Sequence, residues 1–406
     1  MRIDRIIVSI FCLTCLGACG SKGNEPSSEA IVIPYANEKP ESLMADRYFS
    51  DIRFVPLETN EKCLLSEVQQ VEWRDSLLFV CDVDNIFLFN DSGKFVSQIG
   101  RKGRGPGEYI DFRGFFVDMN ARTVGIIRPA AGLIMVYTLD GTYLHSEDIS
   151  LGAYEGYYAM PVDDNKLFIF NSHNPGNNMA YTLVDRDNRE HMEYFYTYDP
   201  VRIEDHTYHF AKHPMTRSGK NIHFTMPLDH HIYEYYNGEV SAKYYIETPS
   251  KIIPKEVMQR DGISRVKGTY LSRLADLTMK DNYFGGFTDI FETDSLIFIH
   301  YMAKLSYPGL YVLNKNNHTG YYHTFPSTSE KFASPVFPFS ASDGNRIVSI
   351  VPMHEMIRVK DYIADNEIEK KGISADMYNT LNGMSEESNP LLIFYTVPSS
   401  ESGPTL

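Results

Sequence analysis

The sequence predicts an all-β chain in which four-stranded units repeat and close into a ring. The clearest unit spans Val68 to Ile99, where four short runs of aliphatic and aromatic residues are separated by turn-forming Asp, Asn and Gly residues. The last turn of this unit recurs further along the chain, giving the series Gly93, Gly141, Asn188 and Gly238. Successive members lie 48, 47 and 50 residues apart, a period that suits one blade of four strands. We therefore expect a six-bladed β-propeller.

Strands are expected where aliphatic and aromatic residues alternate or cluster between these turns. Blade one should use Val68–Trp73, Ser76–Cys81, Asn85–Asn90 and Lys94–Ile99. Blade two should use Phe112–Val117, Val124–Arg128, Ile134–Thr138 and Thr142–Ile149. Blade three should use Gly156–Val162, Lys166–Asn171, Ala180–Asp185 and Glu190–Thr197. Blade four should use Tyr208–Met215, Asn221–Met226, Ile232–Tyr236 and Val240–Glu247.

The interval to the next turn is longer than one period. Asn317 follows Gly238 by 79 residues, and the excess falls at about 252–282, which starts like a helix at Pro254. We expect a helical insertion there, between blades four and five. Blade five should then use Phe284–Glu292, Ser295–Tyr301, Leu310–Asn314 and Gly320–Phe325. Blade six should use Val336–Ser340, Arg346–Val351 and Leu391–Val397, interrupted at about 353–384 by one or two helices packed on the outside.

One predicted strand stands apart from the blades. Tyr48–Leu57 alternates apolar and polar residues and precedes the first complete unit. A ring of blades must hide its open edges, so we expect this strand to complete the last blade and to tie the two chain ends together. The propeller domain would then occupy residues 46–398.

The N-terminus has the layout of a secretory signal, with Arg2 and Arg5 before an apolar run that ends at Leu16. The run is too short to span a bilayer. Leu16-Gly17-Ala18-Cys19 resembles the lipobox of bacterial lipoproteins, which implies cleavage of residues 1–18 and a lipid on Cys19. Gly20 in place of Asp favours the outer membrane of a Gram-negative bacterium, on either its periplasmic or its outer side. The alternative is an ordinary signal peptide with a chance cysteine.

Residues 19–45 are polar and rich in Ser, Glu, Pro and Asn, so we expect a flexible tether there. The whole chain of 406 residues carries a formal charge of −15, with 28 Tyr and 24 Phe. Such a charge disfavours nucleic acid as a partner, because the protein's field repels the phosphates. Cys63 and Cys81 remain for the folded body, either as a disulfide or as small buried apolar residues.

The glycine-rich run Gly100–Tyr109 has two interpretations. Four glycines and a proline would let the chain cross tightly from one blade to the next, with Glu108 and Tyr109 hydrogen-bonding into the crossing. The run lacks the Lys-Ser/Thr ending of a phosphate-binding P-loop. Its amides and cations could instead hold an anionic ligand. The candidate binding residues on and beside this run are Arg101, Arg104, Tyr109 and Arg113.

Other patterns with chemical content are weaker. Tyr154 and Tyr157 could stack on sugar rings if they lie on loops. A calcium site in the central channel would need oxygen ligands from different blades, and the candidates are Asp118, Asp163, Asp229 and Asp289. His206, His209 and His213 would share a metal only through tertiary geometry, because their surroundings look extended. No serine elbow or paired-carboxylate spacing is present.

Three segments together resemble the six-bladed β-propeller lipoproteins of unknown function, relatives of the NHL-repeat and TolB-like propellers. They are Gly100–Tyr109 after Lys94–Val96, the entry Pro56–Thr59 and the ending Asn389–Leu392. The resemblance implies fold and location but no chemistry. We expect a lipid-anchored binding or scaffold module for an envelope protein, peptide or glycan, without a cofactor. The alternative is a Ca²⁺-dependent hydrolase or lyase with its site in the central channel.

Overall fold

The structure is a computed structural model that describes residues 30–398. Several stretches within that range lie outside the description: 37–40, 44, 149–154, 164, 173–178, 188–191, 198–210, 227, 255–256, 258–281, 303–308, 325–326, 330–333 and 366–373. Most of the predicted insertion at 252–282 and the predicted turn at Asn188 therefore lie outside the described residues.

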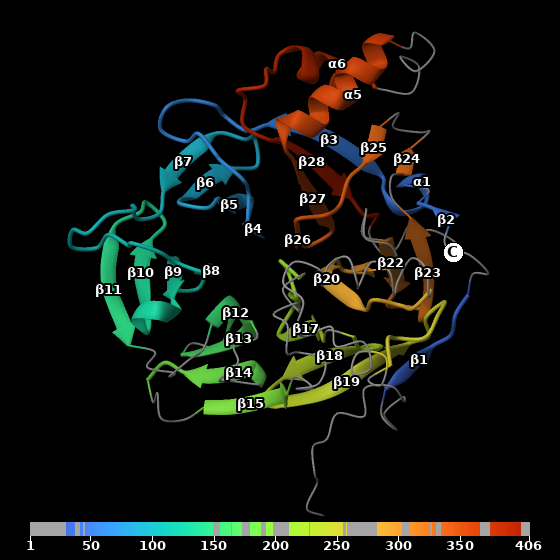
Figure 1. Ribbon diagram of the computed structural model, residues 1–406, viewed down its shortest axis with the longest axis horizontal. Coiled ribbons are helices and arrows are strands. Elements are labelled where there is room, and N and C mark those ends of the chain that lie inside the picture. Colours follow the sequence, from blue (N-terminus) through green and yellow to red (C-terminus); the bar gives the residue numbers. More distant parts are fainter. Residues whose placement is uncertain are drawn as a thin grey trace, which may run out of the picture.

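Six antiparallel sheets surround a central channel, which confirms the predicted propeller (Figure 1). Blade one comprises β4 (Gln70–Arg74), β5 (Leu77–Cys81), β6 (Ile86–Asn90) and β7 (Phe95–Gln98). Blade two comprises β8 (Gly114–Asp118), β9 (Thr123–Arg128), β10 (Leu133–Thr138) and β11 (Tyr143–Asp148), with a short 3-10 helix at Pro129–Ala131. Blade three comprises β12 (Glu155–Asp163), β13 (Lys166–Ser172), β14 (Met179–Asp185) and β15 (Met192–Thr197).

The remaining blades follow in the same order from the channel outward. Blade four comprises β16 (Met215–Ser218), β17 (Asn221–Thr225), β18 (His231–Tyr236) and β19 (Glu239–Ile246). Blade five comprises β20 (Phe287–Glu292), β21 (Leu296–Tyr301), β22 (Gly309–Asn314) and β23 (Thr319–Thr324). Blade six comprises β26 (Ala341–Asp343), β27 (Arg346–Val351), β28 (Leu391–Thr396) and β3 (Asp51–Pro56).

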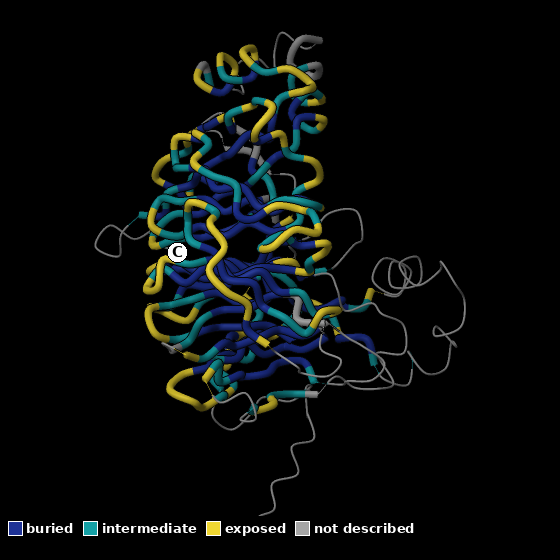
Figure 2. The backbone as a smooth tube through the Cα atoms, turned by 90° about the vertical axis from the view of Figure 1, so that its left-hand side faces the viewer, coloured by how far each residue is buried: buried dark blue, intermediate teal, exposed yellow. Residues whose placement is uncertain are grey.

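The core lies between neighbouring blades, where the faces of adjacent sheets meet. One buried cluster joins Val55 and Leu392 of blade six to Trp73 of blade one, and another joins Phe79 of blade one to Phe115 of blade two. Figure 2 shows buried residues running through the middle of the disc, with exposed residues concentrated in the loops. Each blade is therefore held by its two neighbours, as expected when successive sheets bury their faces against one another.

The last blade is closed by the N-terminal strand, as predicted. β3 pairs antiparallel with β28 over six consecutive residue pairs, from Asp51 opposite Thr396 to Pro56 opposite Leu391. The two strands come from opposite ends of the chain, so this pairing closes the ring without leaving blade six short of a strand.

Two of the predicted turn glycines are required by contact with the preceding blade. Gly93 and Gly141 have φ of 76° and 85°, a region that side chains other than glycine rarely adopt. A Cβ atom at Gly93 would lie 2.3 Å from the Pro56 carbonyl oxygen, and one at Gly141 would lie 2.0 Å from that of Gln98. At Gly93 and Gly141, the 48-residue rhythm therefore marks the point where the turn rests on the outer strand of the blade before it.

Part of the segment predicted as a tether, residues 19–45, belongs to the folded body instead. β1 (Ile31–Ile33) adds a parallel strand to β19 of blade four, and β2 (Glu41–Ser42) adds one to β23 of blade five. Ile33 is fully buried, which explains why this segment leaves solvent. Helix α1 (Ala45–Tyr48) then leads into β3. We call residues 30–48 the N-terminal belt, since it crosses the outer edges of blades four and five (Figure 1).

Blade six differs from the prediction at its inner strand. The expected strand Val336–Ser340 is replaced by β26, and Val336 ends the short strand β25 (Ser334–Val336), which pairs with β24 (Ser327–Ser329). Pro335 and Pro338 lack the amide hydrogen that a central ladder needs. Helices α5 (Met353–Asp365) and α6 (Ala375–Asn382) occupy the predicted helical interruption on the outside. Within the described residues, no helix combines the length and apolar character required to cross a membrane.

One smaller expectation needs correction, and one pair of alternatives is decided. The inner strand of blade four begins at Met215, where the prediction has it end, because the preceding residue is Pro214. Cys63 and Cys81 form no disulfide: both thiols are free and buried, in separate clusters. Burial raises the pKa of both thiols, so they behave as small apolar residues.

A buried polar cluster links the inner strands of blades one and three to the segment that leads into blade four. Glu72 lies on the inner strand of blade one and Tyr158 on that of blade three, and the two are hydrogen-bonded. The Tyr158 hydroxyl also lies 2.9 Å from Nε2 of His213, at the entry to blade four. His213 Nδ1 is 3.0 Å from the Ile290 carbonyl of blade five, and Arg74 pairs with Glu72 at 2.9 Å. We call Glu72, Tyr158 and His213 the channel plug.

When His213 is neutral, the channel plug has fewer hydrogen-bond donors than acceptors. Burial lowers the pKa of His213, and the Ile290 carbonyl requires the ring hydrogen on Nδ1. Nε2 is then an acceptor, so the single hydroxyl hydrogen of Tyr158 faces two acceptors, Nε2 and the Glu72 carboxylate. The side chains of Glu72 and His213 are each 5% exposed. Tyr158 thus holds together two groups that water barely reaches.

A second buried cluster joins blades four and five. His223 Nδ1 lies 2.6 Å from a Glu292 oxygen, and its Nε2 lies 3.1 Å from a Glu234 oxygen. Lys315 contacts the other oxygen of Glu292 at 2.7 Å. Burial alone would lower the pKa of His223, but the two carboxylates outweigh it and raise the pKa to about 9. The hydrogen bond from His223 lowers the pKa of Glu234 to about 2, so the cluster is a protonated imidazole between two carboxylates.

We predict that His223 makes the free energy of unfolding fall as the pH becomes alkaline. The folded-state pKa lies above the ordinary 6.5, so the stabilisation is complete below pH 6.5 and is lost as the pH rises through about 9. Urea unfolding should show a loss of about 3 kcal/mol between pH 6.5 and pH 9.5 that is absent from His223→Gln. The exposed His145→Gln serves as control and should lose as much as the unmodified protein. Equal losses in all three proteins would contradict the assignment.

The channel plug yields a second stability prediction. Tyr158→Phe leaves a buried carboxylate oxygen and a buried ring nitrogen without the hydroxyl that joins them, and should lower the free energy of unfolding by about 2–4 kcal/mol. Tyr143→Phe removes a hydroxyl from a tyrosine that is 37% exposed and should change it by less than about 0.5 kcal/mol. Urea unfolding at pH 7 measures both. A Tyr158→Phe protein as stable as the Tyr143→Phe control would show that the plug contributes nothing.

Candidate binding pocket at the channel mouth

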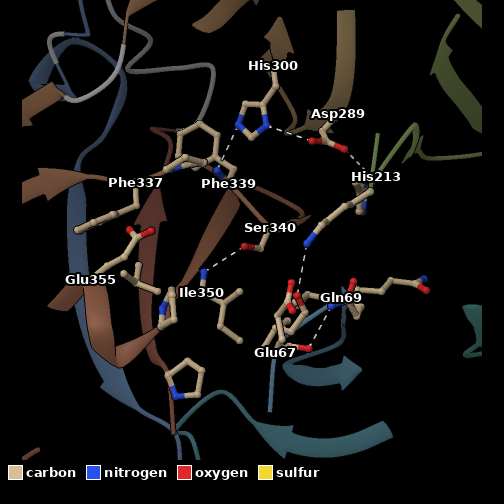
Figure 3. Close-up of a pocket in the computed structure, with 18 of the residues that line it drawn as sticks. Glu67, Gln69, His213, Asp289, His300, Phe337, Phe339, Ser340, Ile350 and Glu355 are labelled. Carbon is tan, nitrogen blue, oxygen red and sulfur yellow. Dashed lines mark hydrogen bonds and ion pairs between the residues drawn. The ribbon is translucent and has the colours of Figure 1, made fainter. Parts of the chain in front are cut away.

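A pocket of about 1090 Å³ opens at one end of the central channel (Figure 3). Its walls come from the segments that lead into the inner strands of blades one, four and six, together with residues of blade five and the start of α5. The contributing segments are Ser66–Val71, Lys212–His213, Val336–Ser340 and Ile350–Pro352. Because these segments enter the ring at the same end, four blades converge on one site.

A chain of hydrogen bonds holds the wall between blades four, five and six. The Asp289 carboxylate accepts the backbone N–H of His213 at 2.6 Å, and its other oxygen lies 3.3 Å from Nδ1 of His300. His300 Nε2 accepts the backbone N–H of Phe339 at 3.3 Å, which places the His300 ring hydrogen on Nδ1. The hydroxyl oxygen of Ser340 accepts the backbone N–H of Ile350 at 3.1 Å. These bonds shape the wall before any ligand arrives.

The channel plug forms part of the pocket floor through His213. Both ring nitrogens of His213 are engaged, by Tyr158 and by the Ile290 carbonyl, and one ring face stacks on Phe291 with centroids 4.9 Å apart. His213 therefore has no free nitrogen for proton transfer to a ligand.

One side of the pocket, which we call the cup, is apolar and aromatic. Phe339 is buried and packs against Phe291, Phe298 and His300, whereas Phe337 is only half-buried and faces the pocket (Figure 3). Further apolar residues of this wall are Val336, Pro338, Ile350, Val351, Pro352 and Val359. A surface of this kind suits the apolar side chains of a ligand.

Charged side chains stand around the apolar wall. Lys212 reaches across the cup from blade four and donates to the Val68 carbonyl of blade one at 3.4 Å. Arg358 and Glu355 enter from α5, and Glu67 enters from the approach to β4. Asp289 is already engaged by two donors, as described above. The cup thus offers both signs of charge beside an apolar surface.

The glycine-rich run lies elsewhere, at the crossing from blade one to blade two. Tyr109 is fully buried and donates its hydroxyl to the Asp84 carbonyl at 3.2 Å, so it is unavailable to a ligand. The Glu108 carboxylate accepts the Gly105 N–H at 2.7 Å, and Gly103 donates to the Tyr109 carbonyl at 2.9 Å. These bonds fold the run into a tight crossing. Arg101, Arg104 and Arg113 are exposed along it and do not line the pocket.

Several other predicted site residues are not described. Cys19 and Tyr154 lie outside the described residues. Tyr157 belongs to β12, but its side chain is not described. His206 and His209 also lie outside the described part of the chain.

The candidate calcium ligands do not come together in the described part of the chain. Asp118 accepts the Ala121 N–H and lies 3.9 Å from Arg186, while Asp229 binds His231 and Tyr233. Asp289 lies in the pocket wall, and the side chain of Asp163 is not described. Among the described residues, no three His, Cys, Asp or Glu side chains are arranged to hold a metal ion.

The sequence reasoning named Asp289 and His213 but missed Lys212, Ser340 and the two phenylalanines of the pocket. Pro335 and Pro338 were the available signal for the wall. A proline inside a predicted inner strand argues against that strand, and it places Phe337 and Phe339 on a loop at the channel mouth. Lys212 carried no local pattern, since its position depends on His213 bonding to blade five.

The fold resembles solved structures of Bacteroides proteins. A Bacteroides fragilis protein, named a putative exported protein, has a TM-score of 0.73 at 21% sequence identity. The match covers 91% of this chain and 100% of the Bacteroides fragilis chain. A member of the DUF4221 family from Bacteroides vulgatus has a TM-score of 0.51 at 10% identity, covering 86% and 97%. No curated protein matches the sequence. A family model described as a domain of unknown function matches residues 29–396, and the chain therefore belongs to that family, DUF4934.

Proposed function

We propose that this protein is a lipid-anchored binding module of the cell envelope, whose ligand occupies the channel-mouth pocket. The ligand class is a peptide, a segment of a protein or a glycan. The observation that carries the proposal is the cup itself: about 1090 Å³, prearranged by hydrogen bonds between blades and bounded below by the channel plug. Concave sites of this size with a few oriented polar groups are typical ligand sites.

Binding accounts for the site better than catalysis does. Three histidines line the cup, and two of them, His213 and His300, have their ring nitrogens engaged by protein partners, whereas His354 is exposed on α5. General acid–base catalysis needs a titratable atom within hydrogen-bonding reach of the substrate. A calcium-dependent hydrolase would also gain stability from its ion, so a rise in melting temperature with added Ca²⁺ would favour the enzyme.

The envelope location is supported by the signal-like N-terminus and by Cys19 within the lipobox-like sequence. The Bacteroides fragilis protein of similar fold is itself named a putative exported protein, which agrees with this address. The described body begins at Ala30, so about ten residues separate it from the lipid in this proposal.

Filling the cup tests the binding proposal. Gln69 lines the pocket and is half-buried, and Gln69→Trp adds an aromatic ring to the cavity without altering the core. Arrays of peptides and glycans should retain ligands on the unmodified protein, and Gln69→Trp should weaken these at least about tenfold at an unchanged melting temperature. Val96→Trp on the exposed outer strand β7 is the control and should bind normally. Ligands that bind Gln69→Trp as well as the unmodified protein would refute the pocket.

The anchor has its own test. Cys19→Ala removes the thiol that would carry the lipid, and the variant should appear in the soluble fraction of fractionated cells. Ser21→Ala, two residues further on, is the control and should stay with the membranes. A Cys19→Ala protein that sediments with the membranes to the same extent would contradict lipid anchoring.

A further inference from the structure

We infer that the pocket recognises a peptide carboxylate, either a C-terminus or an acidic side chain, through Lys212, with an adjacent apolar side chain against Phe337. This inference rests on the proposed binding function and specifies its ligand. It depends on the placement of Lys212, on the donors beside it and on the chemistry of the opposite wall.

The backbone at Lys212 is fixed by its neighbour. His213 donates its N–H to Asp289 at 2.6 Å and accepts the Ile290 N–H at 2.9 Å through its carbonyl. Its Nδ1 makes a third contact, with the Ile290 carbonyl. Lys212 therefore projects from an anchored segment, and its exposed side chain lines the cup.

The ammonium of Lys212 has capacity for a ligand. Its described contact is the Val68 carbonyl at 3.4 Å, a long hydrogen bond that leaves two of its three hydrogens uncommitted. In the described part of the chain, no carboxylate lies within ion-pair distance of Lys212. The contrast is with Lys102, Lys243 and Lys315, which each pair with an acidic side chain. A carboxylate bound here would form a charge-assisted hydrogen bond.

The acidic groups of the pocket do not compete for this position. Asp289 is directed at His213 and His300, while Glu67 lies on the exposed rim and Glu355 on α5. Ser340 accepts from the Ile350 N–H, so its hydroxyl hydrogen remains available as a donor to a ligand. Lys212 and Ser340 therefore offer donors to the cup, while Glu67 and Glu355 lie on the approach to β4 and on α5.

The opposite wall favours a peptide over a sugar. Its described aromatic residues are phenylalanines, joined by Val, Ile and Pro, with neither Tyr nor Trp among them. Sugar sites rely on stacking together with many polar contacts, whereas this wall offers apolar contact alone. The half-buried ring of Phe337 suits an apolar side chain next to the carboxylate. An amphipathic peptide end or an acidic turn has this combination.

The test uses arrayed octapeptides in matched pairs that differ by Asp or Glu against Asn or Gln, or by a free against an amidated C-terminus. The unmodified protein should bind the carboxylate member about tenfold more tightly. Lys212→Met should abolish this preference, Lys212→Arg should keep it, and Lys212→Glu should reverse it toward lysine-bearing peptides. Lys220→Met, an exposed lysine on the turn after β16, is the control and should behave as unmodified protein.

The possible outcomes distinguish a failure of the carboxylate assignment from a failure of the proposed binding function. If the unmodified protein binds both peptides of a pair equally, and Gln69→Trp binds neither, the carboxylate assignment is overturned but the pocket remains the binding site. Binding of glycans alone, lost in Gln69→Trp, would do the same. A carboxylate preference that survives Lys212→Met would assign the recognition to another cation, and peptide binding unaffected by Gln69→Trp would refute both proposals.

Discussion

The antiparallel pairing of β3 with β28 is the constraint on which the ring depends. It joins residues near the two ends of the folded chain, and it brings Val55 and Leu57 into the cluster that packs blade six on blade one. The pocket lies across this same seam, because its walls include the approach to β4 on one side and the segments before β26 and after β27 on the other. Closing the ring therefore also builds the site.

Buried polar groups fix the distances between blades, which apolar packing alone does not do. Blades pack on their neighbours through non-directional contacts, which leave the inner strands free to shift by small amounts. The channel plug and the His223 cluster place hydrogen bonds between blades one, three, four and five, where water cannot substitute for them. The floor of the pocket is consequently held by hydrogen bonds between blades, whereas α5 contributes exposed side chains to its rim.

The fold was accessible from the sequence because its signals are local. Gly93 and Gly141 mark the repeat since each turn must avoid the preceding blade, and the strand at β3 has a clear alternation. The N-terminal belt was missed because its two strands are three and two residues long, too short for a periodic pattern, and because the polar residues that flank 30–35 on both sides resemble a tether.

The pocket was harder to predict from the sequence, because it has no local pattern. Lys212 and Phe337 lie more than 100 residues apart, on connections without regular structure, and only the closed ring brings them to one cavity. The glycine-rich run attracted attention through its composition, yet its hydrogen bonds are directed inward. The composition of the run predicted the crossing between two blades correctly. The pocket, by contrast, is formed by segments of four blades that only the folded ring brings together.

The N-terminal belt has a mechanical consequence. Any tension applied to the chain ahead of Ala30 meets β1 first, then β2 and α1, and only afterwards the strand that closes the ring. These short parallel additions would detach in sequence and absorb the pull while the seam of blade six stays intact. Tension applied at that end would therefore reach the walls of the cup only after these additions had separated.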